Sequence, residues 1–486
     1  MPYVRLISCA FVAYLLGFAA YGEAKSCVYI PTSPTELGAR VPGAEWRAPL
    51  AGWADESPSL LPIVSLEIPA DQLFSPDRGI YVPGNPYLRV GYGANRWGKS
   101  NANYYTKLEA TGRFTLTERG AKEPAYTTLA TFEPNGGGTR ALPQKSLKVT
   151  LDKHAPYRGA FFPGQGVKSY RSFLLRNDGN DWYGPLSGGV STMMRDAVLH
   201  LIVSSLDIGG QAYRPVSVRL NGTYWGIHNL REAINKHYFE TRYGVSAKNV
   251  DILEHEESAK DGSRVTIKVD SGDKKSAKEY LEMLRRFSVL DMTKDASLAE
   301  IAREVDLDNY TDYVITEAFY ANADWPYNNL QLWRAHKKDG SAGKYGDGRW
   351  RWVLYDLDMA GLEVHKKGGY DFDMFAYLKS GAEAGVEHPA YLINLLWRNS
   401  GYRARFVART KELVATVFSR EATSAVIEAA KKVVAPEIER HFCRWGRSWT
   451  AADWARAVDQ AIVTFLEKRR AATLAHLEKH FKEDLN

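Results

Sequence analysis

Hydrophobic and polar residues alternate with a period of two in the first half of this chain and follow a helical period in the second half. Between Ile63 and Leu151, short alternating runs are separated by Gly and Pro, a pattern typical of strands. The runs are IVSLEI at 63–68, GRFTLT at 112–117 and SLKVTL at 146–151. Another strand is predicted at 172–175. The first half is therefore expected to be rich in β structure.

The next segment predicts one helix and one hairpin. Apolar residues at helical spacing indicate a helix over 192–206, with Ser191 as its candidate N-cap. Two strands are then predicted at 216–220 and 224–230. They are joined by Asn221-Gly222, and an Asn-Gly pair between alternating apolar runs is the strongest short hairpin signal.

Beyond residue 235 the helical period dominates. Helices are predicted at 276–287, 298–303, 309–320, 402–418, 422–434 and 451–480. One β interruption is expected, a second hairpin formed by LQLWR at 330–334 and RWRWVLYDLD at 349–358. The pattern thus predicts an α+β chain, with a junction near 231–238.

The length of 486 residues predicts two lobes or domains, because single hydrophobic cores rarely grow so large. We predict a signal peptide at 1–24, an irregular leader at 25–61, a β-rich amino-terminal lobe at 62–234 and a mainly helical carboxyl-terminal lobe at 235–486.

The first residues have the pattern of a secretory signal peptide. Arg5 precedes an apolar stretch from Leu6 to Tyr21, and cleavage is expected after Ala24. An uncleaved anchor is the alternative, but the stretch is short for the roughly 20 residues that span a bilayer. We expect a secreted, periplasmic or cell-surface protein with no stable membrane span after cleavage. Cys27 and Cys443 would remain, either as a disulfide or as two free thiols.

Charge gives little support to nucleic-acid binding. The formal net charge is +6, and the 63 basic residues are interleaved with 57 acidic ones rather than gathered into a run. A nucleotide or an acidic protein substrate would need only a local basic pocket.

The first candidate for chemistry lies after the helix predicted at 309–320. Asp324 precedes Asn329 by five residues, the spacing that a kinase catalytic loop uses for its base and its metal-binding amide. Asp324 is therefore a candidate base and Asn329 a candidate metal ligand. The alternative is a turn in which polar side chains satisfy the local backbone, and this motif alone favours that reading.

The second hairpin strand ends in Asp356 and Asp358. Two carboxylates at the end of a buried strand are costly unless they are paired or bind metal. Alternate strand residues share a face, so both are expected to reach one cation. The alternative is a strand-end turn with both side chains in water.

Basic and polar candidates lie in the β-rich half. The glycine-rich turn at 135–140 precedes Lys145 and Lys148, and such a turn lets backbone amides approach phosphate. The two lysines are predicted on opposite strand faces, so only one would enter a cleft. Three further candidates have weaker signals, and each taken alone is more often structural: Arg176 in a polar turn, Asp196 on the first helix as a partner for the lysine, and Glu232 after the hairpin, where it could meet a purine.

Taken together, these motifs resemble the CotH kinases, a family named for a spore-coat protein. The matching stretches are PQKSLKV at 143–149, FLLRNDGNDW at 173–182, RD at 195–196, LNGTYWGIHNLREAI at 220–234, ADWPYNNLQLW at 323–333 and WRWVLYDLD at 350–358. They occur in the family's order, and the combination is specific although no single stretch is.

The resemblance implies a divergent, two-lobed protein-kinase-like fold that binds ATP with Mg²⁺ or Mn²⁺ and phosphorylates Ser or Thr of a protein substrate. It would make Asp324 the catalytic aspartate, Asp356 the main metal ligand and Lys145 the likelier phosphate-binding lysine. Two alternatives stay open: a non-catalytic surface or adhesive protein on the same scaffold, and an enzyme that transfers AMP.

Overall fold

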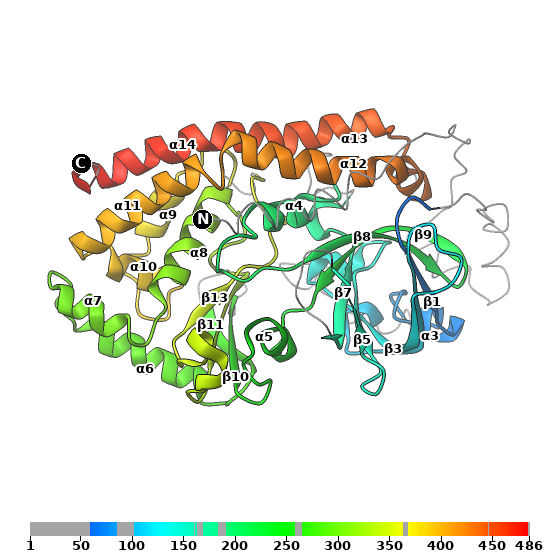
Figure 1. Ribbon diagram of the computed structural model, residues 1–486, viewed down its shortest axis with the longest axis horizontal. Coiled ribbons are helices and arrows are strands. Elements are labelled where there is room, and N and C mark those ends of the chain that lie inside the picture. The colour runs from blue at the N-terminus through cyan, green and yellow to red at the C-terminus, as the bar shows by residue number, and fades with distance from the viewer. Residues whose placement is uncertain are drawn as a thin grey trace. The chain divides into compact units, whose positions relative to one another are not determined.

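The computed structural model describes residues 59–84, 102–159, 161–162, 169–182, 191–257, 265–362, 368–445 and 447–484 (Figure 1). The expected signal peptide, its cleavage site, Cys27 and nearly all of the leader lie outside these residues. Cys443, the other cysteine of the expected mature chain, is buried.

The chain forms two compact units, and each unit is assembled from three stretches of sequence. The barrel unit consists of Met1–Met194, Ala212–Ala233 and Glu428–Val458, and the helical unit consists of Arg195–Gln211, Ile234–Ile427 and Asp459–Asn486. The sequence predicted two lobes that are each continuous in sequence, whereas each observed unit also includes segments from elsewhere in the chain.

Seven strands of the barrel unit close into a barrel in the order β1-β2-β3-β4-β7-β9-β8. Neighbouring strands are antiparallel except for the closing pair, β1 and β8, which is parallel. The strands are β1 Ile63–Glu67, β2 Ala110–Thr117, β3 Tyr126–Pro134, β4 Leu147–Leu151, β7 Ser172–Arg176, β8 Tyr213–Leu220 and β9 Thr223–Glu232. The sequence pattern predicted most of these strands but neither β3 nor the closure.

Alternation explains how the barrel fills its interior. Phe114, Phe132 and Phe173, on three different strands, are fully buried, and the rings of Phe114 and Phe173 lie 5.1 Å apart. The predicted hairpin between β8 and β9 is confirmed. Asn221 and Gly222 have φ angles of 49° and 82°, the left-handed geometry that a two-residue hairpin turn requires.

Short elements and two helical segments complete the barrel unit. They are α3 Ala70–Phe74, η3 Asn103–Tyr105, η4 Gly138–Ala141, β5 Tyr157–Arg158, β6 Ser169–Tyr170, η5 Gly179–Asp181, the second part of α12 Arg420–Arg444, and α13 Ala451–Val458.

The helical unit contains a four-stranded antiparallel sheet where the sequence predicted only a hairpin. Its order is β11-β10-β12-β13, with strands β10 Val250–Glu257, β11 Val265–Ser271, β12 Leu330–Ala335 and β13 Arg351–Val353. The predicted pairing of β12 with β13 is confirmed, but β13 ends at Val353 rather than at Asp358. One face of the sheet packs on α5 Lys236–Tyr243, with Phe239 and Trp333 in the shared core.

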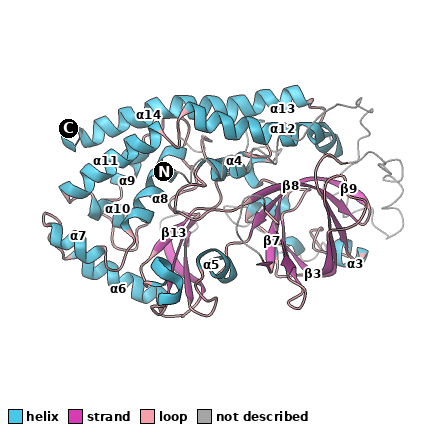
Figure 2. Cartoon of the chain, viewed as in Figure 1, coloured by secondary structure: helices cyan, strands magenta, loops and turns pink. Residues whose placement is uncertain are grey.

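Helices make up most of the rest of this unit, as Figure 2 shows. They are α4 Arg195–Ile202, α6 Ser276–Ser288, α7 Asp295–Ile301, α8 Leu307–Tyr320, α9 Met374–Lys379, α10 Tyr391–Leu396, α11 Ser400–Ala415, the first part of α12, and α14 Thr464–Phe481, with 3₁₀ segments η7 Gly340–Gly346 and η9 Lys482–Asp484. A π-helical segment, η8 Asp459–Val463, interrupts the helix predicted over 451–480.

The α+β class predicted from the sequence is confirmed. Within the described ranges, none of the helices combines the length and apolar character that crossing a bilayer requires.

Candidate functional site

Lys145 lies inside the barrel unit, two residues before β4, and its side chain is almost completely buried. Its ammonium donates to the backbone carbonyls of Arg140 at 2.6 Å and Leu142 at 3.2 Å. The ammonium also lies 4.1 Å from the ring centre of Tyr104, within cation–π range. The residues at the end of the glycine-rich turn therefore hold this lysine through their carbonyl oxygens.

Burial lowers the pKa of Lys145 to about 7, because desolvation disfavours the charged ammonium. The two carbonyls and the aromatic ring act in the opposite direction, since they stabilise the charged form. A phosphate group beside this lysine would add a stronger stabilisation of the same charge. Lys145 therefore has the properties of a cation that becomes fully charged when an anion binds.

Lys148 occupies a different environment on β4. Its ammonium lies 3.5 Å from the Glu133 carboxylate on β3, and both side chains are about one-third exposed. Of the two lysines, only Lys145 is therefore buried. Lys148 makes an ordinary cross-strand ion pair with Glu133.

Three of the motif stretches meet at Gln144, next to Lys145. The Gln144 side chain donates to the carbonyl of Ile227 at 2.8 Å and accepts from the indole N–H of Trp182 at 2.8 Å. Its neighbour Ser146 donates to Asn177 Oδ1 at 2.7 Å. These long-range bonds fix the backbone on both sides of Lys145. Gln144 was not among the predicted site residues, because no local feature of the sequence marks it as a junction.

Arg176 and Glu232 lie at the ends of paired strands, β7 and β9, in the same unit. Glu232 is buried, and its carboxylate accepts from the backbone N–H of Ala212 at 2.9 Å, just before β8 begins. Arg176 is partly buried on β7, opposite Asn229. Both residues therefore belong to strands of the barrel.

Asp324 lies in the helical unit, in the loop between α8 and β12. Its two carboxylate oxygens accept hydrogen bonds from Asn328 Nδ2 and Asn329 Nδ2, each at 3.1 Å. Its backbone N–H donates to Asn322 Oδ1 at 3.2 Å. The loop thus orients the carboxylate with amides from its own residues.

Asn329 and Asn322 also connect this loop to Asp356. The side-chain nitrogens of both residues lie 3.5 Å from the backbone carbonyl of Asp356. Asn322 donates in addition to the buried carboxylate of Glu317 at 3.1 Å. The structure therefore brings together Asp324, Asn329 and Asp356, and it adds Asn322, whose only sequence signal was its place two residues before Asp324.

The backbone is unusual at two of these positions. Asn329 and Asp356 both have φ angles of 56°, in the left-handed region that residues other than Gly seldom occupy. Such conformations persist where surrounding contacts fix them, and they cluster at functional sites. Asp356 and Asp358 are not on a strand as predicted, because β13 ends at Val353 and both residues lie in the turn beyond it. Asp356 is partly exposed and Asp358 is buried.

Asp196 holds this turn from α4. Its Oδ1 accepts the backbone N–H of Leu357 at 2.8 Å, between the two acidic residues. The same oxygen lies 3.4 Å from Nε2 of His200, one helical turn along. Asp196 belongs to the helical unit, whereas Lys145, its predicted partner, belongs to the barrel unit.

Asn329 has the chemistry of a metal ligand. Its nitrogen is directed to Asp324, and in the part of the chain that the structure describes its Oδ1 accepts no hydrogen bond. Amide and carboxylate oxygens suit Mg²⁺ or Mn²⁺, which proteins often hold with few side chains together with water and substrate phosphates. Among the described residues, no three His, Cys, Asp or Glu side chains form a cluster able to hold a metal ion. The donor set therefore fits an ion that arrives with phosphate better than a closed protein cage.

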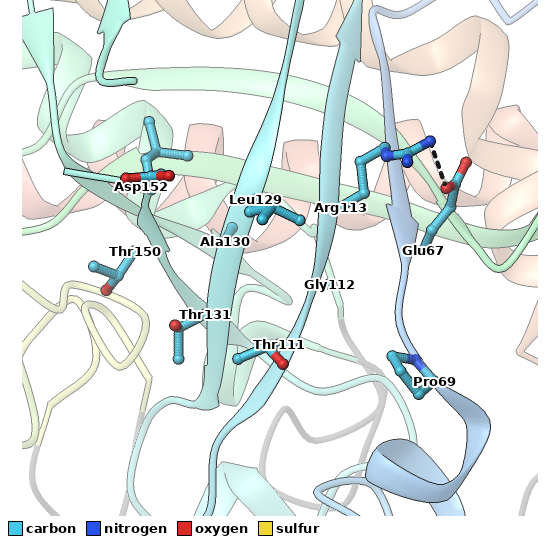
Figure 3. Close-up of a pocket in the computed structure, with 11 residues that line it drawn as sticks. Glu67, Pro69, Thr111, Gly112, Arg113, Leu129, Ala130, Thr131, Thr150 and Asp152 are labelled. Carbon is cyan, nitrogen blue, oxygen red and sulfur yellow. Dashed lines mark ion pairs between the residues drawn. The ribbon is translucent and has the colours of Figure 1, made fainter. Parts of the chain in front are cut away.

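A pocket of about 560 Å³ lies elsewhere, on the exposed face of β1 to β4 (Figure 3). Leu129 and the ion-paired side chains of Arg113 and Glu67 are among its lining residues. It contains none of the predicted site residues. The pocket is open and is lined by both polar and apolar groups. It has neither the enclosure nor the converging polar groups of a nucleotide site.

Residues 132–473 match the family described as CotH kinase protein, a match that includes every predicted site residue. No curated protein matches the sequence. Because the matched region covers more than half of the chain, this protein belongs to the CotH kinase family.

Proposed function

We propose that this protein is an exported kinase that transfers the terminal phosphate of ATP to Ser or Thr of a protein substrate, with Mg²⁺ or Mn²⁺. The supporting observation is the hydrogen-bonded cluster of Asp324, Asn329 and the Asp356 backbone. Family membership supports a kinase-like activity, while the substrate, the metal and export belong to the proposal. The assignment of a two-lobed protein-kinase-like fold belongs to it as well, with the barrel unit corresponding to the β-rich lobe.

In this proposal Asp324 is the catalytic base. Its carboxylate accepts the proton of the substrate hydroxyl as that oxygen bonds to the terminal phosphorus and the bond to the bridging oxygen of ADP breaks. The amides of Asn328 and Asn329 hold the carboxylate in one orientation, so little reorientation is needed when the hydroxyl arrives.

Asn329, Asp356 and Asp358 are the proposed metal ligands. The cation would neutralise charge on the phosphate oxygens. Asp196 positions the turn that carries the two carboxylates by accepting the N–H of Leu357. The proposed ligands therefore rest on a backbone that is fixed without the ion.

Lys145 is the proposed phosphate-binding cation, supported by its burial beside the glycine-rich turn. Lys148, Arg176 and Glu232 are proposed to contribute to nucleotide binding less directly.

The deciding experiment is phosphate incorporation from labelled ATP into casein-like protein substrates, with and without Mg²⁺ or Mn²⁺. Wild-type protein is expected to label the substrate, whereas folded Asp324→Ala and Asp356→Ala variants are not. Equal labelling by wild type and variants would refute the assignment. Intact-mass measurement of the product separates added phosphate from added AMP. Absence of thermal stabilisation by ATP with metal would favour the non-catalytic surface protein.

Export is tested separately, by amino-terminal sequencing of protein recovered from the cell surface or the medium. The expected mature chain begins at Lys25. Recovery of the full-length chain from the cytoplasm alone would overturn this part of the proposal.

A further inference from the structure

Arg469 on α14 is a buried guanidinium that binds four backbone carbonyls of the helical unit. Only 2% of the residue is exposed. Its nitrogens donate to Ala318 at 2.7 Å, Phe319 at 2.9 Å, Tyr370 at 3.0 Å and Phe372 at 2.6 Å. Burial lowers the pKa of Arg469 only to about 10, so the side chain stays charged at neutral pH. One cation therefore joins two separate segments of backbone.

The first segment is the end of α8, which leads directly into the Asp324 loop. The last carbonyls of a helix lack partners within the helix, and a cation at this end also interacts favourably with the helix dipole. Arg469 supplies both effects at Phe319, and at Ala318 it adds a second donor to a carbonyl that also accepts the N–H of Ala321. The chain then turns at Ala321, whose φ of 44° is unfavourable for a residue with a Cβ. This turn places Asn322 and Asp324, so fixing the helix end also fixes the start of the loop.

The second segment, residues 370–372, follows the turn that carries Asp356 and Asp358. A Cβ built on nearby Gly368 would lie 3.2 Å from the Cβ of Ala323, so this part of the chain packs directly beside the Asp324 loop. The next residue, Asp373, is bound by two more side chains of α14: Lys479 at 3.0 Å and His480 at 2.8 Å. Helix α14 therefore fixes this segment as well.

We propose that Arg469 is a positioning residue for Asp324, acting through the end of α8 and through the 370–372 segment. The inference rests on the proposed function, because it gives the carboxyl-terminal helix a part in arranging the catalytic base. A guanidinium is needed here, since a lysine ammonium cannot present a planar fork to four carbonyls.

The test compares Arg469→Lys with the matched control Arg403→Lys. Arg403 lies on α11 in the same unit and donates to the carbonyl of Trp397, at the end of α10, at 3.0 Å. Helix α10 does not lead into the Asp324 loop. Phosphate transfer is measured at saturating and limiting ATP for both variants, at a temperature where both are folded by circular dichroism.

Arg469→Lys is expected to lower kcat at least tenfold with less than a twofold change in KM for ATP, because displacing a catalytic group by about 1 Å costs up to about 100-fold. Arg403→Lys is expected to keep kcat within about twofold. Added guanidinium ion, below denaturing concentrations, should partly restore Arg469→Ala and leave Asp324→Ala inactive. Wild-type kcat in Arg469→Lys would overturn the inference.

A second measurement does not depend on activity. Amide hydrogen exchange at residues 321–324 is expected to accelerate in Arg469→Lys and to stay unchanged in Arg403→Lys. Equal exchange in the two variants would overturn the positioning role. An inactive wild type would instead refute the proposed function, and the exchange comparison would still decide whether Arg469 fixes the loop.

Discussion

The Lys145 region of the barrel unit and the Asp324 region of the helical unit are held by different means. Lys145 is enclosed and is bound by backbone carbonyls and an aromatic ring. Asp324 is partly exposed and is oriented by side-chain amides in a loop with unusual φ angles. The basic group is thus shielded from water, whereas the acidic group remains accessible. Lys145 is therefore expected to lower the stability of the fold, because its ammonium is buried. The carboxylate of Asp324 is expected to remain accessible to a substrate.

The largest expected effect is on activity in Asp324→Ala. Removing the base and its hydrogen bonds should lower kcat by about 10²–10⁴-fold, the usual contribution of a positioned general base. Stability should change little, because the carboxylate is partly exposed. Labelled-phosphate transfer and thermal melting measure the two effects. Asp339→Asn, a change at the partly exposed N-cap of the 3₁₀ segment η7 in the same unit, is the control and should retain activity.

In the barrel unit, Lys145→Met should lower activity without lowering stability. Activity is expected to fall about 100-fold, because phosphate loses a charge-assisted partner. Stability should stay equal or rise, since an apolar side chain of similar length replaces a buried cation that has no carboxylate partner among the described residues. A loss of more than about 2 kcal/mol in urea unfolding would show that the lysine stabilises the barrel.

Wild type and Lys145→Met should also differ in how their stability depends on pH. The pKa of Lys145 is lowered to about 7 in the folded state, against 10.5 for the ordinary side chain. Between these values the unfolded chain binds more protons than the folded chain, so the stability of wild type relative to Lys145→Met should rise with pH from about 7 to about 10.5. Below pH 7 the difference should be constant. Urea unfolding across this pH range measures the difference in unfolding free energy between the two proteins. A difference that does not change with pH would contradict the enclosed environment of Lys145.

A smaller effect distinguishes two neighbouring amides of the Asp324 loop. Asn328 and Asn329 both donate to Asp324, but only Asn329 also contacts Asp356. Asn329→Ala should raise the Mg²⁺ or Mn²⁺ concentration for half-maximal activity about tenfold, because it removes a proposed ligand. Asn328→Ala should change it less than twofold. Similar metal dependence in the two variants would mean that Asn329 only orients the carboxylate.

The smallest expected effect concerns the support of the acidic turn. Asp196→Ala leaves the buried N–H of Leu357 without its acceptor, which should cost about 1–3 kcal/mol of stability. Asp196→Asn keeps an oxygen at this position and should cost less. Urea unfolding of both variants measures the difference, and equal losses would show that charge matters more than the hydrogen bond.

Local signals in the sequence were reliable where local geometry decides the structure. Asn221-Gly222 specified its hairpin because both residues tolerate positive φ. The meeting of Asp324 and Asn329 was predictable, since they lie only five positions apart in one loop. Strand β10 was not predicted, because its charged residues, such as Asp251 and Glu254, obscure the apolar pattern of a strand.

Contacts between residues far apart in the sequence could not be predicted. The roles of Gln144 and Arg469 depend on partners 83 and 150 positions away, which no spacing rule reveals. The misplaced end of β13 has a similar origin. Asp356, three residues beyond the end of β13, adopts a left-handed φ that is incompatible with a strand, and Asp196, far earlier in the sequence, binds the turn that follows.

The exchange of segments between the two units has a practical consequence for anyone dividing this protein. Since each unit needs three separate pieces of polypeptide, no single cut can release an intact half. A fragment ending at residue 234 would lack Glu428–Val458, and the complementary fragment would lack Arg195–Gln211. Expression as separate domains should therefore give insoluble or unfolded products, and a single proteolytic nick should leave the pieces associated until denaturant is added.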